Sequence, residues 1–135
     1  MQSAEINQLM HAAAQDAIAY AAEQHQLTLD GSAESLAVVD ALLSALHKDQ
    51  QHRQHSGEML FTLCNIIGAY VGEVFIKLVG GDWNNNQQDQ SAPYIAVTFG
   101  DKEFPFASVC YHKIANDDTI SLQDYVRQAK ENAMQ

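Results

Sequence analysis

The chain has 135 residues, of which 47% are hydrophobic, and its 17 acidic and seven basic residues give a net charge of −10. This length and composition are typical of one domain with a single core, so we expect one α+β domain over residues 1–135. An acidic surface repels phosphate backbones, which argues against a nucleic-acid partner. Two cysteines are too few for a disulfide framework and are expected to be buried thiols in a reducing compartment.

The sequence predicts a cytoplasmic protein. The N-terminal residues MQSAEINQLMHAAAQ lack the basic start and the continuous apolar segment of a signal peptide. The most apolar stretch is interrupted by Asn65, Glu73 and Lys77 and contains no run of about 18 apolar residues, so we expect no membrane span.

A first helix is predicted from about Ser3 to His25, because small apolar residues recur along it at helical spacing. Small residues bury little area, so this helix is expected to cover the core. A turn at Asp30-Gly31-Ser32 leads into a second helix from about Ala33 to Lys48, which has a leucine-rich face. The polar stretch after it, HKDQQHRQHSG, is predicted to be a loop that ends in an N-cap for the next helix.

The longest apolar stretch, LFTLCNIIGAYVGEVFIKLVGGDW, covers residues 60–83. Its apolar residues, Phe61 and Leu78 among them, recur at steps of three and four around a wide face, which predicts a helix running through the core. A line of small residues follows this helix, where another helix or a sheet can approach closely: Cys64, Gly68 and Gly72. The pair Gly80-Gly81 is expected to end the helix.

The last third of the chain is strand-like before it returns to helix. A short strand at Asp82-Trp83, a strand at residues 93–99 and an edge strand at 102–106 predict an antiparallel meander of two or three strands. Residues 107–114 fit a helix or a strand, and helix is favoured. Ser121 opens a last helix that ends near Asn132. The predicted fold is therefore N-terminal helices and a long buried central helix packed with a small antiparallel sheet and a C-terminal helix.

Three patterns follow one another in the middle of the chain: Gly68-Ala-Tyr-x-Gly-Glu-Val74, Gly80-Gly-x-Trp83 and Phe104-Pro105-Phe106. With the closing Ser-Leu helix, they resemble a family of small, largely uncharacterised bacterial α+β proteins over about residues 29–126. The resemblance implies helices first and a small sheet after. It supplies no reaction and no catalytic role for residues within these patterns.

Glu73 is the leading candidate for chemistry, because it is a carboxylate in an apolar helix with Tyr70 three residues before it and Lys77 four after. In that setting it could act as a general acid or base. The favoured alternative is structural: Glu73 pairs with Lys77 or accepts hydrogen bonds from backbone amides of the turn at residues 80–83.

Other chemistry-bearing patterns are incomplete, and the sequence predicts no cofactor and no metal site. His47, His52 and His55 cluster after the second helix, but no cysteine or carboxylate stands at a matching ligand spacing. Cys110 and His112 are close in sequence, but on a helix their side chains would diverge.

Two functional classes remain. The favoured one is a non-enzymatic acidic protein-binding module, immunity- or adaptor-like, that docks a basic protein on its first two helices, with Asp16 and Glu23 as candidate binding residues. Residues 1–47 carry six acids with no opposing base, whose field is expected to steer that partner: Glu5, Asp16, Glu23, Asp30, Glu34 and Asp40. The alternative is a small ligand-binding domain or enzyme with a cleft near Tyr70, Glu73 and Trp83, extended by Tyr94. A third interpretation is that the acidity serves only solubility. The protein is expected to be a monomer or a homodimer.

Overall fold

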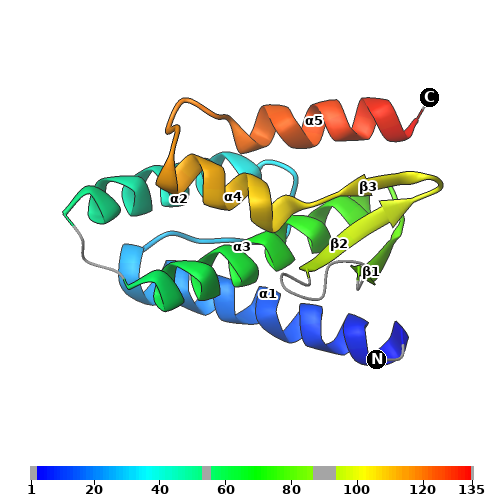
Figure 1. Cartoon of the computed structure of the whole chain (residues 1–135), viewed down its shortest axis with the longest axis horizontal. Coiled ribbons are helices and arrows are strands. Elements are labelled where there is room, and N and C mark those ends of the chain that lie inside the picture. Colours follow the sequence, from blue (N-terminus) through cyan, green and yellow to red (C-terminus); the bar gives the residue numbers. More distant parts are fainter. Residues whose placement is uncertain (1–2, 53–55, 87–93, 135) are drawn as a thin grey trace.

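The computed structural model describes residues 3–52, 56–86 and 94–134, and within them it contains five helices and three strands (Figure 1). Their bounds are α1 (Ser3–His25), α2 (Ser35–Gln51), α3 (Gly57–Leu78), β1 (Asp82–Asn86), β2 (Tyr94–Phe99), β3 (Lys102–Phe104), α4 (Phe106–Ala115) and α5 (Leu122–Ala133). The predicted α+β class and the order of elements are confirmed, and the ambiguous segment after β3 is a helix.

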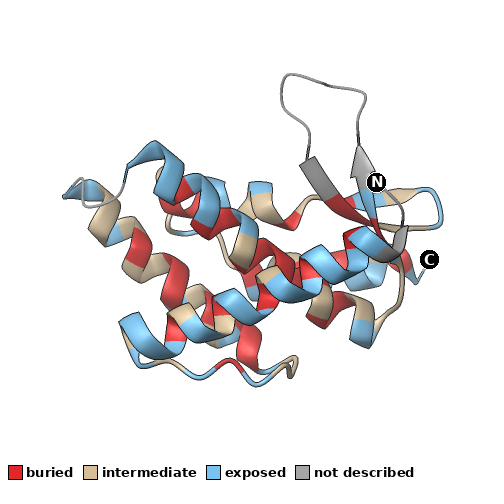
Figure 2. Cartoon of the chain, turned by 90° about the horizontal axis from the view of Figure 1, so that it is seen from below, coloured by how far each residue is buried: buried red, intermediate tan, exposed pale blue. Residues whose placement is uncertain are grey.

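Helix α3 is the central element, with α1 along one side of it and α4 along the other (Figure 1). The helix begins as predicted, because the Ser56 side chain accepts a hydrogen bond from the Met59 backbone amide at 3.1 Å. It ends just before Gly80 and Gly81, whose positive φ angles of 118° and 106° turn the chain into the sheet. Figure 2 shows that the buried residues lie mainly where the helices face one another.

The line of small residues on α3 allows the close contacts that the sequence predicts. A Cβ atom at Gly68 would lie 2.7 Å from backbone atoms of Ala107, so the start of α4 rests directly on α3. A Cβ atom at Gly72 would lie 2.0 Å from the indole ring of Trp83. Gly68 therefore allows α4 to pack closely on α3, and Gly72 leaves room for the side chain of Trp83 from the sheet.

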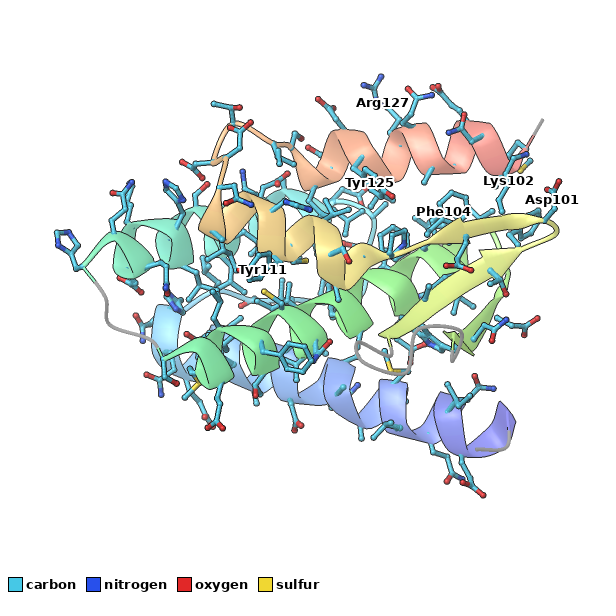
Figure 3. The ribbon with its side chains drawn as sticks, viewed as in Figure 1. Asp101, Lys102, Phe104, Tyr111, Tyr125 and Arg127 are labelled. Atoms are coloured by element: carbon cyan, nitrogen blue, oxygen red, sulfur yellow. The ribbon has the colours of Figure 1, made fainter. Side chains whose placement is uncertain are left out.

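The sheet is an antiparallel meander in the order β1-β2-β3. Its register sets Trp83 opposite Val97 and Val97 opposite Phe104, and all three side chains are buried. They form one row across the sheet that packs on the helices. Phe104, which is labelled in Figure 3, meets the Phe75 ring of α3, and the ring centroids are 5.0 Å apart.

Helix α5 closes the core at its far end. The predicted cap is present, because the Ser121 hydroxyl oxygen accepts a hydrogen bond from the Asp124 amide at 3.1 Å. Inside the helix, half-buried Tyr125 meets Phe106 edge-on with 5.9 Å between ring centroids. The aromatic core therefore links α3, β3, α4 and α5.

Three local predictions are wrong. Helix α2 continues to Gln51, because the Lys and Gln residues of the expected loop are good helix formers and no Gly interrupts them before Gly57. Phe61 is 65% exposed and Leu78 is 44% exposed, although both were predicted to be buried. Each lies near an end of α3, where the neighbouring helices cover less of the apolar circumference.

Candidate functional site

A cleft of about 430 Å³ opens between α1, α3 and the turn before α2. Its polar lining residues come from all three segments: His11, Gln15, Gly31, Tyr70, Glu73 and Lys77. The remaining wall is apolar and consists of Ala14, Ile18, Val74 and Ile76. Two of the residues predicted from the sequence, Tyr70 and Glu73, therefore line one cleft.

Glu73 is fixed from two sides. Its Oε2 atom accepts a hydrogen bond from the Trp83 indole N–H at 3.3 Å, and its Oε1 atom lies 3.1 Å from Nδ1 of His11. The side chain is 30% exposed, so the carboxylate stays within reach of the cleft. Glu73 is an acceptor, as the structural interpretation predicts, but its partners are an indole and an imidazole. Among the described contacts, neither Lys77 nor a backbone amide of the 80–83 turn binds the Glu73 carboxylate.

His11 is the site residue that sequence reasoning missed. A carboxylate only accepts hydrogen bonds, so the ring nitrogen that faces Glu73 carries hydrogen, and this orients the second ring nitrogen. The His11 side chain is 68% exposed at the rim of the cleft. It is 62 residues from Glu73 in sequence, and only its place on the edge of the α1 apolar stripe indicated that it faces α3.

Tyr70 belongs to the floor of the cleft and is 2% exposed. Its hydroxyl oxygen accepts a hydrogen bond from the Gly31 amide at 2.8 Å and lies 2.6 Å from the Ser35 hydroxyl. The Ser35 hydroxyl in turn donates to the Ser32 carbonyl at 2.6 Å, so the proton between Tyr70 and Ser35 comes from Tyr70. These hydrogen bonds connect α3 to the start of α2 and give Tyr70 a structural role.

Lys77 supplies a positive charge on the other side of the cleft. Its Nζ atom would lie 4.0 Å from a Cβ atom at Gly31, so the amine extends over the turn before α2. Asp30 in that turn has a lowered pKa, chiefly because it accepts hydrogen bonds from the Ser32 side chain and backbone, with a smaller contribution from Lys77. The cleft is thus lined by a cation, the Lys77 amine, as well as by the Glu73 carboxylate and the His11 imidazole.

Trp83 is not among the described residues that line this cleft. Trp83 is buried behind Glu73 and acts through its hydrogen bond to that carboxylate. Tyr94 opens β2, but its side chain lies outside the part of the chain that the structure describes.

Asp16 and Glu23 lie on a different surface, the exposed side of α1. Together with Glu5 they are separated by 11 and seven residues, close to three and two whole turns, so all three carboxylates point the same way. We call Glu5, Asp16 and Glu23 the acidic ridge. It extends about 27 Å at 1.5 Å per residue, and exposed apolar residues lie between the acids: Leu9, Ala12 and Ala19.

Asp40 does not belong with these exposed acids, although the sequence grouped it with them. Its carboxylate accepts hydrogen bonds from the amides of Leu122 at 2.6 Å and Gln123 at 3.0 Å, and so caps α5. Lys113, whose side chain is 5% exposed, places Nζ 3.8 Å from Asp40 Oδ1. Asp40 therefore joins α2, α4 and α5 and has an opposing base.

The histidine cluster and the two cysteines show no sign of a reactive site where they are described. The ring of His47 donates from Nδ1 to the Ile114 carbonyl at 2.8 Å, and His55 lies outside the described residues. Burial raises the pKa of the Cys64 thiol to about 12 and that of Cys110 well above its usual value, so neither thiol is activated. Over residues 3–52, 56–86 and 94–134, no group of three or more His, Cys, Asp or Glu side chains is placed to hold a metal ion.

No protein-family model matches the sequence, and no curated protein or solved structure gives a significant match. The resemblance to small bacterial α+β proteins therefore stays a prediction. Within the described residues, α3 is the one helix long and apolar enough to cross a membrane by length and composition. Most of it is buried inside the protein, which is the ordinary state of a core helix.

Proposed function

We propose that this protein is a non-enzymatic binding module that docks a basic protein on the acidic ridge of α1. The observation that carries the proposal is the alignment of Glu5, Asp16 and Glu23 on one exposed side of a 23-residue helix. No Lys or Arg occurs before Lys48, so the ridge has neither on its own helix. A field of this kind steers a basic partner toward the surface.

The spacing of the ridge favours an elongated partner segment. Carboxylates at intervals of 11 and seven residues match cations at the same intervals on a second helix of about 18 residues lying along α1. Between the acids, Leu9 and the exposed alanines offer apolar contact that does not compete with the charges. Electrostatic steering acts mainly on the association rate, whereas these packed contacts act on dissociation.

Surface plasmon resonance with the whole protein immobilised tests the proposal. The probe is a synthetic amphipathic helical peptide of about 20 residues with lysines at the ridge intervals. We expect the association rate to fall with salt and to fall again in the double variant Asp16→Asn with Glu23→Gln, while the dissociation rate changes little. The matched control is Asp101→Asn with Glu131→Gln, which removes the same charge from exposed positions off α1.

Equal effects of the two double variants would show that only net charge matters, and the ridge would then be a solubility feature. An association rate that responds to neither salt nor substitution would remove the proposal altogether.

A second candidate function is supported by the cleft. The Lys77 amine and the Glu73 carboxylate face one cleft of about 430 Å³, which suits a small ligand that carries both an anionic group and a hydrogen-bond donor, such as an amino acid. We expect such a ligand to raise the melting temperature of the wild type and not of Glu73→Gln. The absence of any thermal shift across the natural amino acids would remove this candidate.

A further inference from the structure

A second hollow lies on the other long side of α3, between its first half and α4. It has a volume of about 300 Å³ and is lined by Phe61, Cys64, Asn65, Ala107, Ser108, Tyr111 and His112. We call these seven residues the aromatic groove. Tyr111 is labelled in Figure 3, where it lies over α3 and α4.

Two aromatic rings flank the groove and neither is covered. Phe61 is 65% exposed and Tyr111 is 45% exposed. Large exposed side chains beside a hollow are typical of binding surfaces, where aromatic residues contribute much of the energy. None of the seven lining residues is Asp, Glu, Lys or Arg, so the groove is a neutral area on a protein with a net charge of −10.

One carboxylate stands at the end of this neutral area. Glu58, Phe61 and Asn65 are spaced at i, i+3 and i+7 on α3, so they follow one side of the helix. Glu58 is exposed, and the ring of Phe61 and the amide of Asn65 come next along the line. Along this side of α3 the order is therefore a carboxylate, an aromatic ring and a polar amide. The Tyr111 ring belongs to the α4 side of the groove.

This order fits an arginine side chain. A guanidinium group is planar, stacks on aromatic faces and donates in a fork to a carboxylate, and it is more weakly hydrated than an ammonium group. Its aliphatic stem can lie against the apolar base of the groove while its charge reaches Glu58. A lysine has the charge but not the planar stacking surface.

We propose that the aromatic groove binds an arginine side chain of the basic partner. The inference rests on the proposed function and identifies where that partner is anchored. Helix α1 lies on the side of α3 away from α4 (Figure 1), so a partner that follows the acidic ridge and crosses α3 reaches the groove. The ridge then provides attraction at a distance, and Phe61 and Tyr111 provide the contact that selects arginine over lysine.

The test compares two synthetic helical peptides of the same length and charge, one with arginines and one with lysines at every cationic position. We expect wild-type protein to bind the arginine peptide at least roughly fivefold more tightly in isothermal titration. Phe61→Ala should reduce that ratio toward one and leave the affinity for the lysine peptide unchanged. Both Phe61 and the matched control residue Met134 are exposed, so both Ala variants should fold, and Met134→Ala should leave the ratio at its wild-type value.

The outcomes separate the two proposals. If both peptides bind with salt dependence but Phe61→Ala leaves the ratio unchanged, the groove proposal is overturned and the ridge proposal stands. If neither peptide binds, both proposals are removed. If Phe61→Ala instead abolishes self-association in analytical ultracentrifugation and does not alter peptide binding, the groove receives a second copy of the chain, and the arginine proposal is wrong.

Discussion

Replacing Gly72 with alanine adds one methyl group at the most crowded of the seven glycine positions. The new Cβ atom would lie 2.0 Å from Cη2 and 2.4 Å from Cζ2 of Trp83, well inside the contact distance of two carbon atoms. The indole ring must therefore move. Because its N–H donates to Glu73 at 3.3 Å, the movement also loosens the carboxylate that holds His11.

The size of the effect follows from opposing contributions. Overpacking a core by a methyl group costs about 1 to 3 kcal/mol, and a hydrogen bond to a charged acceptor contributes about 1.5 to 3 kcal/mol, less at a partly exposed carboxylate. Alanine regains about 1 kcal/mol of helix propensity over glycine. We expect Gly72→Ala to lower the free energy of unfolding by about 2 kcal/mol, and Gly72→Leu by more, since a larger side chain meets the same ring.

Gly57→Ala is the matched control, because a Cβ atom at Gly57 has no neighbour within 4 Å. That variant should be unchanged or up to about 1 kcal/mol more stable. Urea unfolding followed by circular dichroism measures both variants. Trp83 is the only tryptophan in the chain, so its fluorescence reports the ring directly, and we expect emission to shift to the red in Gly72→Ala.

The reasoning would be refuted if Gly72→Ala unfolded within about 0.5 kcal/mol of wild type with unchanged emission. A double-mutant cycle gives a second check. In a Trp83→Leu background, the added methyl group should cost much less, because the ring that it meets is gone.

Three further outcomes follow from the described contacts. Asp40→Ala should lower the free energy of unfolding by about 1 to 3 kcal/mol in urea melts, because the Leu122 and Gln123 amides lose their acceptor and the buried Lys113 loses one of its two carboxylates, whereas removing the Asp16 or Glu23 carboxylate should change it by less than about 0.5 kcal/mol. Iodoacetamide at pH 8 should modify Cys64 and Cys110 only after unfolding, since burial raises both pKa values, and rapid alkylation of the native protein would contradict their burial. Zinc should not raise the melting temperature, because His47 already donates to a carbonyl, and a concentration-dependent rise would reveal a metal site.

Much of the fold could be predicted because its signals are local. The spacing of apolar residues predicted α1, α3 and α5, the Ser56 and Ser121 caps are present, and the glycine pair at 80–81 ends α3. The exposure of Phe61 could not be read from the same pattern. Periodicity identifies which side of a helix is apolar, but the neighbouring elements decide how much of that side they cover.

The contacts of the candidate site were beyond local reasoning. Glu73 was identified from its apolar surroundings, yet its partner His11 is 62 residues away and Trp83 reaches it from the next element. Asp40 was misjudged for the same reason, since it caps a helix that begins 82 residues later. A carboxylate on a helix looks alike in the sequence whether it faces solvent or a distant amide.

The most direct test of the acidic ridge as the partner surface is a two-dimensional ¹H–¹⁵N NMR titration of the full chain with the lysine peptide. We predict that the largest amide shifts fall along the exposed side of α1, including Asp16 and Glu23, and that they weaken as salt is added. The amides of Asp101 and Glu131, which are equally acidic and exposed, should move little. Shifts spread evenly over all acidic positions, or confined to the cleft around Glu73, would contradict the account.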